Sequence, residues 1–224
     1  MSQKFSAGTN SRLKMIRAGA DLFHKQGVHL TTPKEVVKAS GVTMNQFYHH
    51  FKNKEGLVHS VLQTYCDAIK NADGPVNSID YRISSWQDLE KWFFGHINLQ
   101  KRFRMTRGCP FGTVGNEIMA QEGAVREDLS EIFEVVKTKL AAFFEKEKRE
   151  GRLAKNATAD LLADFCIVTV QGAMLLGKVK QDNKPVEAAV RQALTHLKKY
   201  SIMRKLDERR TRLRKRGGQV RSRT

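Results

Sequence analysis

Hydrophobic positions recur every three or four residues along nearly the whole chain, which is the spacing of one face of an α-helix. Leu13, Ile16, Ala20 and Phe23 repeat in this way near the N-terminus. No segment shows the sustained alternation of apolar and polar residues that is typical of a half-buried strand. The pattern therefore predicts an all-α protein.

Capping residues, glycines and prolines divide this pattern into separate helices. The first helix should end at Gly27, and Pro33 suits the first turn of the next one. The sequence DGPVNS at 73–78 forms the clearest linker, and RGCPFGTVGNEI at 107–118, with three glycines and a proline, is expected to interrupt helical structure. The predicted helices span residues 11–27, 31–40, 42–51, 54–71, 84–103, 125–150, 158–180 and 184–203.

The second and third predicted helices are short and are joined by the sequence GVT. Two short helices joined by a three- to four-residue turn that contains Gly form a helix-turn-helix, whose second helix lies in the major groove of DNA. In that geometry Val36, Val37, Val42 and Phe47 point inward and hold the two helices together. Phe51 is interpreted as core in the same way.

The residues expected to contact DNA lie on the exposed side of the second helix and at helix starts. Asn and Gln can form paired hydrogen bonds with adenine, and Met can contact a thymine methyl group. Backbone N–H groups at helix N-termini favour phosphate. The predicted DNA contacts are Thr31, Thr32, Thr43, Met44, Asn45, Gln46, Tyr48, His49 and Lys54.

Charge is concentrated at the two ends of the chain, whose formal net charge is +17. Residues 1–62 hold 9 Lys/Arg against 3 Asp/Glu, and residues 204–224 hold 10 against 2. The middle, with 21 against 18, is nearly balanced. Nucleic acid is the commonest polyanionic partner of such basic segments. The tail 204–224 has the composition of a disordered segment, and it either adds non-specific attraction to phosphates or has no role.

Several classes of protein do not fit the sequence. The chain has no GxSxG, HExxH, P-loop or dinucleotide motif, so no enzyme activity and no cofactor are predicted. Three cysteines without a CxxC pair favour a reducing cytoplasm over a disulfide framework, and the adjacent His49 and His50 diverge on a helix, so no metal site is expected. No signal peptide is visible and no apolar run approaches the roughly 20 residues that cross a bilayer, so a cytoplasmic protein without membrane contact is predicted.

The sequence TTPKEVVKASGVTMNQFYHHFKNKEGL at 31–57 resembles the DNA-binding segment of the TetR family of bacterial repressors. The resemblance rests on the capping threonine, the ASGVT turn, the FYHHF run and the KNKEGL start of the fourth helix. It implies about nine helices, with a helix-turn-helix domain at 1–53 and a ligand-binding and dimerisation domain at 54–203. Asn45 departs from the family, which often has Gly there, and Gln46–Phe47 replaces a commoner small–Leu pair, so the operator sequence does not follow from the resemblance.

The function that this resemblance implies is transcriptional regulation by a homodimer. Such a protein binds a palindromic operator on double-stranded DNA and leaves it when a small molecule, an electrophile or an oxidant acts on the C-terminal domain. A repressor is the first interpretation, although the sign of regulation depends on where the operator lies. The alternative from a different class is a helical interaction protein with non-specific DNA affinity, which would lack sequence preference.

Residues of the second domain provide two hypotheses for the signal. A plain small-molecule pocket would be lined by Trp92, Phe93, His96, Phe111, Asn116, Phe165, Val168, Gln171 and Met174, although such residues are more often ordinary core. The segment RGCPFG instead resembles the Gly-Cys element of TetR repressors that detect electrophiles or reactive chlorine through one cysteine.

In the second hypothesis Cys109 is the sensor and Lys178 occupies the place of the lysine that partners it in those relatives. Arg104 and Arg107 are close in sequence and were expected to favour the thiolate of Cys109. An ordinary buried cysteine and a lysine that reaches the surface are the simpler alternatives. Cys66 and Cys166 are interpreted as structural.

Overall fold

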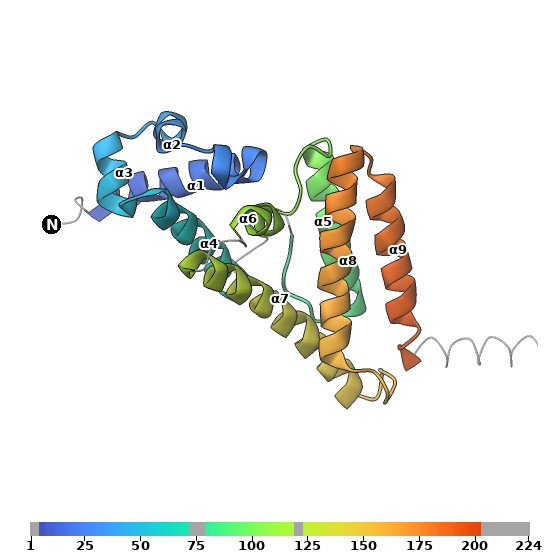
Figure 1. The fold of residues 1–224 in the computed structure, drawn as a ribbon. Helices are drawn as coiled ribbons and strands as arrows, with labels where there is room; N and C mark the ends of the chain where they lie inside the picture. The colour runs from blue at the N-terminus through green and yellow to red at the C-terminus, as the bar shows by residue number, and fades with distance from the viewer. Residues whose placement is uncertain (1–4, 72–78, 119–122, 203–224) are drawn as a thin grey trace, which may run out of the picture.

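The structure, a computed structural model, describes residues 5–71, 79–118 and 123–202, and within these ranges the chain forms nine α-helices and no strand (Figure 1). An isolated β-bridge joins Leu153 to Ser201. The predicted linker 73–78 and the basic tail 204–224 lie outside the described residues. The helices are α1 Phe5–Leu30, α2 Pro33–Ser40, α3 Met44–Phe51, α4 Lys54–Asn71, α5 Trp86–Arg102, α6 Pro110–Ile118, α7 Ala124–Arg149, α8 Ala159–Lys180 and α9 Lys184–Lys198.

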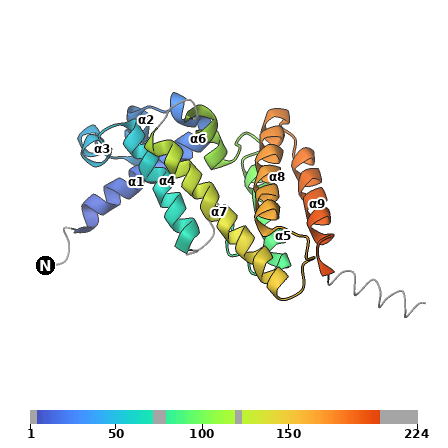
Figure 2. The ribbon, with the colours of Figure 1, turned by 60° about the horizontal axis from the view of Figure 1, so that its bottom comes forward.

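Helices α1 to α3 form one end of the molecule, and α5, α8 and α9 form the other (Figures 1 and 2). Helices α4 and α7 pack along each other and connect the two ends. One continuous cluster of buried apolar residues extends from Met15 in α1 to Leu197 in α9. The small and the large parts therefore share a core, with Leu57 of α4 packed against Gly19 of α1 at their junction.

The segment 107–118 differs from the prediction, because residues 110–118 form helix α6 instead of a break. Proline is well tolerated at the first position of a helix, where its missing N–H needs no partner. Gly112 allows α6 to approach α8 closely, because a Cβ atom at this position would lie 2.7 Å from Oε1 of Gln171. Gly112, which would weaken a helix in isolation, here suits the close packing of α6 on α8.

Helix α8 is apolar on more than one side. Leu162, Cys166 and Val170 are buried, whereas Leu161 and Val168 are 66% and 70% exposed. The expectation that no apolar run is long enough to cross a membrane was wrong for this helix, which has sufficient length and apolar composition, with a mean hydropathy of 1.6. Length and composition alone are weak evidence for a membrane span, because core helices of globular proteins share them.

Candidate nucleic-acid interface and effector site

Helices α2 and α3 both begin with a capping box, in which a threonine and the residue three positions later satisfy each other's backbone N–H groups. Thr32 Oγ1 accepts a hydrogen bond from Glu35 N at 3.3 Å, and Glu35 Oε2 accepts one from Thr32 N at 2.8 Å. Thr43 and Gln46 repeat the arrangement at the start of α3. The two helices therefore have well-defined starts, as the helix-turn-helix prediction requires.

Helix α3 buries one face and exposes the other. Phe47 and Phe51 are 0% and 4% exposed, and Phe47 is among the largest fully buried side chains. Asn45, Gln46 and His49 are exposed, and Tyr48 is 52% exposed. The polar and aromatic residues predicted to contact DNA are thus available on one side of a rigidly packed helix.

Three of the predicted DNA contacts have other roles in this structure. Thr31 is completely buried and its hydroxyl donates to Gly27 O at 2.6 Å, so its side chain cannot reach DNA. The Lys54 ammonium group donates to Val28 O at 2.9 Å and to His29 O at 3.3 Å, and so binds the C-terminal end of α1. Met44 is half-buried and packs against the core.

Gln46 has a double role that the sequence does not reveal. Its Oε1 atom accepts hydrogen bonds from Thr43 N at 3.0 Å and from Thr43 Oγ1 at 3.2 Å. Paired recognition of adenine needs both the oxygen and the nitrogen of a glutamine amide. Gln46 must therefore leave its capping contact to read an adenine in that manner, whereas Asn45 has no such contact among the described residues.

Two lysines near this surface were not among the predicted contacts. Lys34 is exposed in the first turn of α2, and Lys52 is exposed immediately after α3 with a positive φ of 62°. Both carry the charge that phosphate contacts need. The positive charge of lysines at the ends of the two short helices could have indicated these two phosphate contacts from the sequence.

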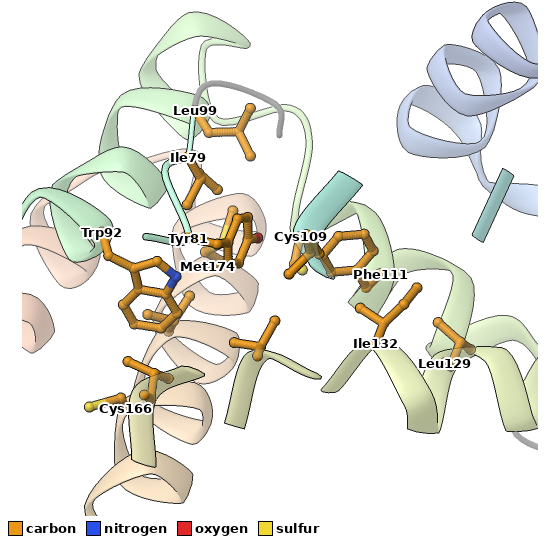
Figure 3. Packing of buried hydrophobic residues seen from close by; sticks show 14 of the residues in the cluster. Ile79, Tyr81, Trp92, Leu99, Cys109, Phe111, Leu129, Ile132, Cys166 and Met174 are labelled. Carbon is orange, nitrogen blue, oxygen red and sulfur yellow. The ribbon is translucent and has the colours of Figure 1, made fainter. Parts of the chain in front are cut away.

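Cys109 lies at the start of α6, where its sulfur is buried among apolar side chains. It is 7% exposed, and Figure 3 shows it beside Phe111 and Tyr81, well away from Cys166. Gln171 Nε2 donates to its Sγ at 3.3 Å, and the backbone N–H groups of Phe111 and Gly112 also donate to it. Three donors therefore converge on one sulfur atom.

Burial nevertheless raises the pKa of the Cys109 thiol, and the hydrogen bonds from Gly112, Gln171 and Phe111 only oppose this effect. The expectation that nearby arginines favour the thiolate was wrong. Arg107 Nη1 instead donates to Asp21 Oδ1 at 2.6 Å, with its guanidinium carbon 4.1 Å from the centre of the Phe103 ring. Arg104 is exposed.

Lys178 is brought close to the segment that carries Cys109. A Cβ atom added to Gly108 would lie 3.6 Å from Cδ of Lys178, and Lys178 is half-buried. In the part of the chain that the structure describes, no hydrogen bond joins the lysine to the sulfur, so the two residues lie in one region without being paired.

The predicted effector residues separate into two groups. Trp92, His96, Cys109, Phe111 and Gln171 line a common pocket of about 20 Å³, which has room for one water molecule. Tyr81 and Ile79 also line it and were missed, because they lie in an irregular segment without helical spacing.

The remaining predicted effector residues do not line this pocket. Phe93 and Met174 are completely buried in the core, and Phe165 contacts the ring of His196 at a centroid distance of 5.0 Å. Asn116 is exposed on α6, and Val168 is 70% exposed on α8. For Asn116 and Val168 the expectation of a pocket position was wrong, because helical spacing alone does not show which face is buried.

The two parts of the chain match two family models. The model for "Bacterial regulatory proteins, tetR family" matches residues 15–61, and that for "Tetracyclin repressor-like, C-terminal domain" matches residues 88–193. The chain belongs to the TetR family.

Named relatives of this TetR-family protein include repressors and regulators. It is 25% identical over 181 residues to the "HTH-type transcriptional repressor DhaR" of Mycobacterium sp. (strain GP1), which covers 81% of this chain and 89% of the relative. It is 24% identical over 177 residues to the "Transcriptional regulator AcuR" of Cereibacter sphaeroides, covering 79% and 80%. The family and these relatives confirm the prediction of a DNA-binding transcriptional regulator rather than an enzyme.

Solved structures confirm the all-α TetR fold. The regulatory protein TetR from Rhodobacter sphaeroides superposes with a TM-score of 0.71 at 23% identity, covering 83% of this chain and 98% of that one. The reduced form of E. coli NemR gives a TM-score of 0.68 at 19% identity, covering 85% and 97%. These likenesses establish the fold of the TetR-family chain.

A buried histidine gives this TetR-family protein a specific pH dependence of stability. His96 is 5% exposed, and burial lowers its pKa to about 4, although its Nδ1 contacts Trp92 O at 2.8 Å. Between about pH 6.5 and pH 4 the unfolded chain binds a proton at this residue that the folded chain does not. Stability should therefore fall by up to about 3 kcal/mol as pH decreases through this window, and remain unaffected by His96 above it.

Urea denaturation of the wild type and of His96→Gln between pH 4 and pH 8 measures this effect. The difference between the two proteins removes the contribution of carboxylates that titrate in the same range. A constant difference across this pH range would contradict the assignment of a neutral, buried His96.

Proposed function

We propose that this protein is a homodimeric, cytoplasmic repressor that binds a palindromic operator and is released by a small-molecule, electrophile or oxidant signal. The observation that carries the proposal is the exposed polar and aromatic face of α3 on a tightly packed helix-turn-helix. Residues 1–53 serve as the DNA-binding domain, and residues 54–203 as the regulatory and dimerisation domain. The named relatives, a repressor and a regulator, support the regulatory role.

The proposed DNA contacts follow from exposure. Asn45, Gln46, Tyr48 and His49 face outward from α3 and read base edges or contact phosphates. Thr32 and Thr43 begin the two short helices, whose N-terminal N–H groups attract phosphate. Lys34 and Lys52 add charge beside them, whereas Thr31 positions the backbone from within the core.

The outer face of α8 supports a dimer. Five large apolar residues are exposed along this one helix, a larger concentration than a monomer ordinarily leaves in water. Gly172 lies among them with open space around the position of a Cβ atom, which permits close approach of a second helix. A twofold copy of the same face is the simplest cover. The residues are Leu161, Val168, Leu175, Leu176 and Val179.

A route from Cys109 to the DNA-binding end runs through α6. Gly108, next to the cysteine, accepts a hydrogen bond from His24 Nε2 of α1 at 2.8 Å. At the other end of α6, Glu117 Oε2 accepts one from His29 N at 2.7 Å. Modification of the buried sulfur needs space that the 20 Å³ pocket does not provide, so α6 must shift, and both contacts with α1 shift with it.

Selection of genomic DNA fragments by the purified protein at near-physiological salt tests the proposed function. Recovery of a palindrome is expected, with Tyr48→Ala lowering affinity for it about tenfold through loss of a ring and a hydroxyl at the DNA surface. Tyr48→Phe separates the hydroxyl from the ring. Recovery of unrelated fragments, bound through contacts that vanish as salt rises, would instead favour the interaction protein with non-specific DNA affinity.

The cysteine hypothesis predicts a single sensitive site. N-ethylmaleimide should release the wild type from the operator, because the Cys109 sulfur adds to the maleimide double bond and the other alkene carbon takes up a proton. Cys109→Ser should remain bound under the same treatment, whereas Cys166→Ser should behave as wild type. Release of Cys109→Ser that equals release of the wild type, measured by fluorescence anisotropy, would contradict the sensor and favour a plain small-molecule signal.

Lys178 is tested separately, because its role depends on its charge. Lys178→Gln should slow alkylation of Cys109 severalfold if the ammonium group assists formation of the thiolate, while Lys178→Arg should slow it less. Mass spectrometry of the labelled protein measures the rate. Equal rates for the three proteins would leave Lys178 as a surface residue near Gly108.

A further inference from the structure

A second, larger pocket lies where the DNA-binding end meets the regulatory domain. Its volume is about 350 Å³, it is partly open to solvent, and it is lined by residues of α1, α4, the end of α5 and the segment that follows α5. It shares no lining residue with the small pocket at Cys109. Ligand pockets in proteins commonly start at about 300 Å³, so this space can accept a small organic molecule.

The walls of this pocket combine an apolar floor with a basic rim. Ile16, Val61 and Leu99 are buried and provide apolar surface. Arg17 from α1 adds positive charge at this pocket, and Arg102 at the end of α5 also lines it.

Arg107 is the third arginine of the pocket and is held in position by two contacts. Its guanidinium group pairs with Asp21 at 2.6 Å and lies over the Phe103 ring at 4.1 Å. The Arg107 side chain is 13% exposed, whereas that of Asp21 is 62% exposed. Asp21, the one carboxylate that lines the pocket, therefore pairs with Arg107 and faces mainly solvent, and Arg17 adds a further positive charge.

We propose that this pocket binds a small organic carboxylate with an apolar body, such as an aromatic acid. A guanidinium group recognises carboxylate through two parallel hydrogen bonds, and the floor provides the contact surface for the apolar part. Because α1 and α5 both contribute lining residues, such a ligand would join the DNA-binding end to the regulatory domain. This pocket shares no lining residue with the small pocket at Cys109, so the protein has a place for a second signal beside the one proposed above.

Isothermal titration with benzoate, using the full-length protein without DNA, tests the site. Saturable binding with one ligand per chain is expected. Benzyl alcohol, which lacks the charge, and inorganic phosphate, which lacks the apolar body, should each bind at least tenfold more weakly. Neither DNA nor the cysteine takes part, so failure here leaves the proposed repressor function standing.

Two variants and one control variant locate the binding. Arg17→Gln should weaken benzoate binding about tenfold, the usual effect of losing a charged hydrogen-bond partner. Ala20→Leu should weaken it, because Ala20 lines the pocket and the larger side chain takes up part of the space. Arg126→Gln removes an exposed arginine that does not line the pocket and should leave binding unchanged. Urea denaturation checks that each variant is folded.

Four results would overturn the proposal. Phosphate that binds as tightly as benzoate indicates a surface anion site, and benzyl alcohol that does so indicates an apolar pocket without carboxylate recognition. Binding of unchanged affinity in a folded Ala20→Leu variant places the ligand elsewhere. Absence of binding at millimolar benzoate would also overturn the proposal.

Discussion

Phe47→Ala is expected to destabilise the protein by about 3 to 5 kcal/mol and to abolish operator binding. Phe47 is completely buried, and its ring contacts those of Tyr48 and Phe51 at centroid distances of 5.5 and 5.6 Å. Alanine would leave a cavity at the point where α3 packs on α1 and α2. The loss should be large because a helix of eight residues depends on tertiary contacts for its stability. Urea denaturation followed by circular dichroism measures the loss.

The neighbouring residue provides the matched control. Tyr48→Ala changes an aromatic residue on the same helix, but Tyr48 is half exposed, so its stability should change by roughly 0.5 kcal/mol or less while DNA binding weakens. The pair separates loss of the fold from loss of a contact. If the free energy of unfolding of Phe47→Ala differs from that of the wild type by less than 1 kcal/mol, about fivefold in the folding equilibrium, the buried position of this ring is contradicted.

Gly27→Ala is expected to cost about 3 to 5 kcal/mol for two reasons that can be separated. Gly27 has φ 86° and ψ 167°, a conformation that residues with a side chain adopt only at a cost of about 1 to 3 kcal/mol. An added Cβ would also lie 1.8 Å from Glu117 Oε1, so the Glu117 carboxylate must move and lose its hydrogen bond to His29 N. A charged hydrogen bond of this kind contributes about 1.5 to 3 kcal/mol.

A double-mutant cycle with Glu117→Ala measures the two parts. In the Glu117→Ala background, Gly27→Ala should cost only the backbone strain, because the displaced carboxylate is already absent. The difference between the two costs is the coupling between α6 and α1. Equal costs in both backgrounds, determined from urea denaturation, would show that Glu117 does not restrain α1.

Most of the helical architecture could be predicted from the sequence, because periodic apolar residues and capping threonines act locally. Thr32, Pro33 and Thr43 begin helices where expected, and Gly27 interrupts α1. Helix α6 was missed because the close packing that requires Gly112 comes from Gln171, a residue distant in sequence.

The candidate sites were less predictable, because exposure and electrostatics depend on tertiary contacts. Thr31 and Thr32 are adjacent and chemically identical, yet one is buried against Gly27 and the other caps a helix. Arg107 is two residues from Cys109 in sequence, but its guanidinium group forms an ion pair with Asp21. The interdomain pocket could not be foreseen at all, since its walls come from segments that only the fold brings together.

The apolar outer face of α8 also has a genetic consequence. A chain that keeps its fold but loses its DNA contacts retains Val168, Leu175 and Val179 on the surface through which the proposed dimer forms. Such a chain would pair with intact protomers and produce mixed dimers in which only one DNA-binding end is functional. Defective alleles of this regulator should therefore be dominant over the wild-type copy, whereas alleles that also carry a charge at Val168 should be recessive.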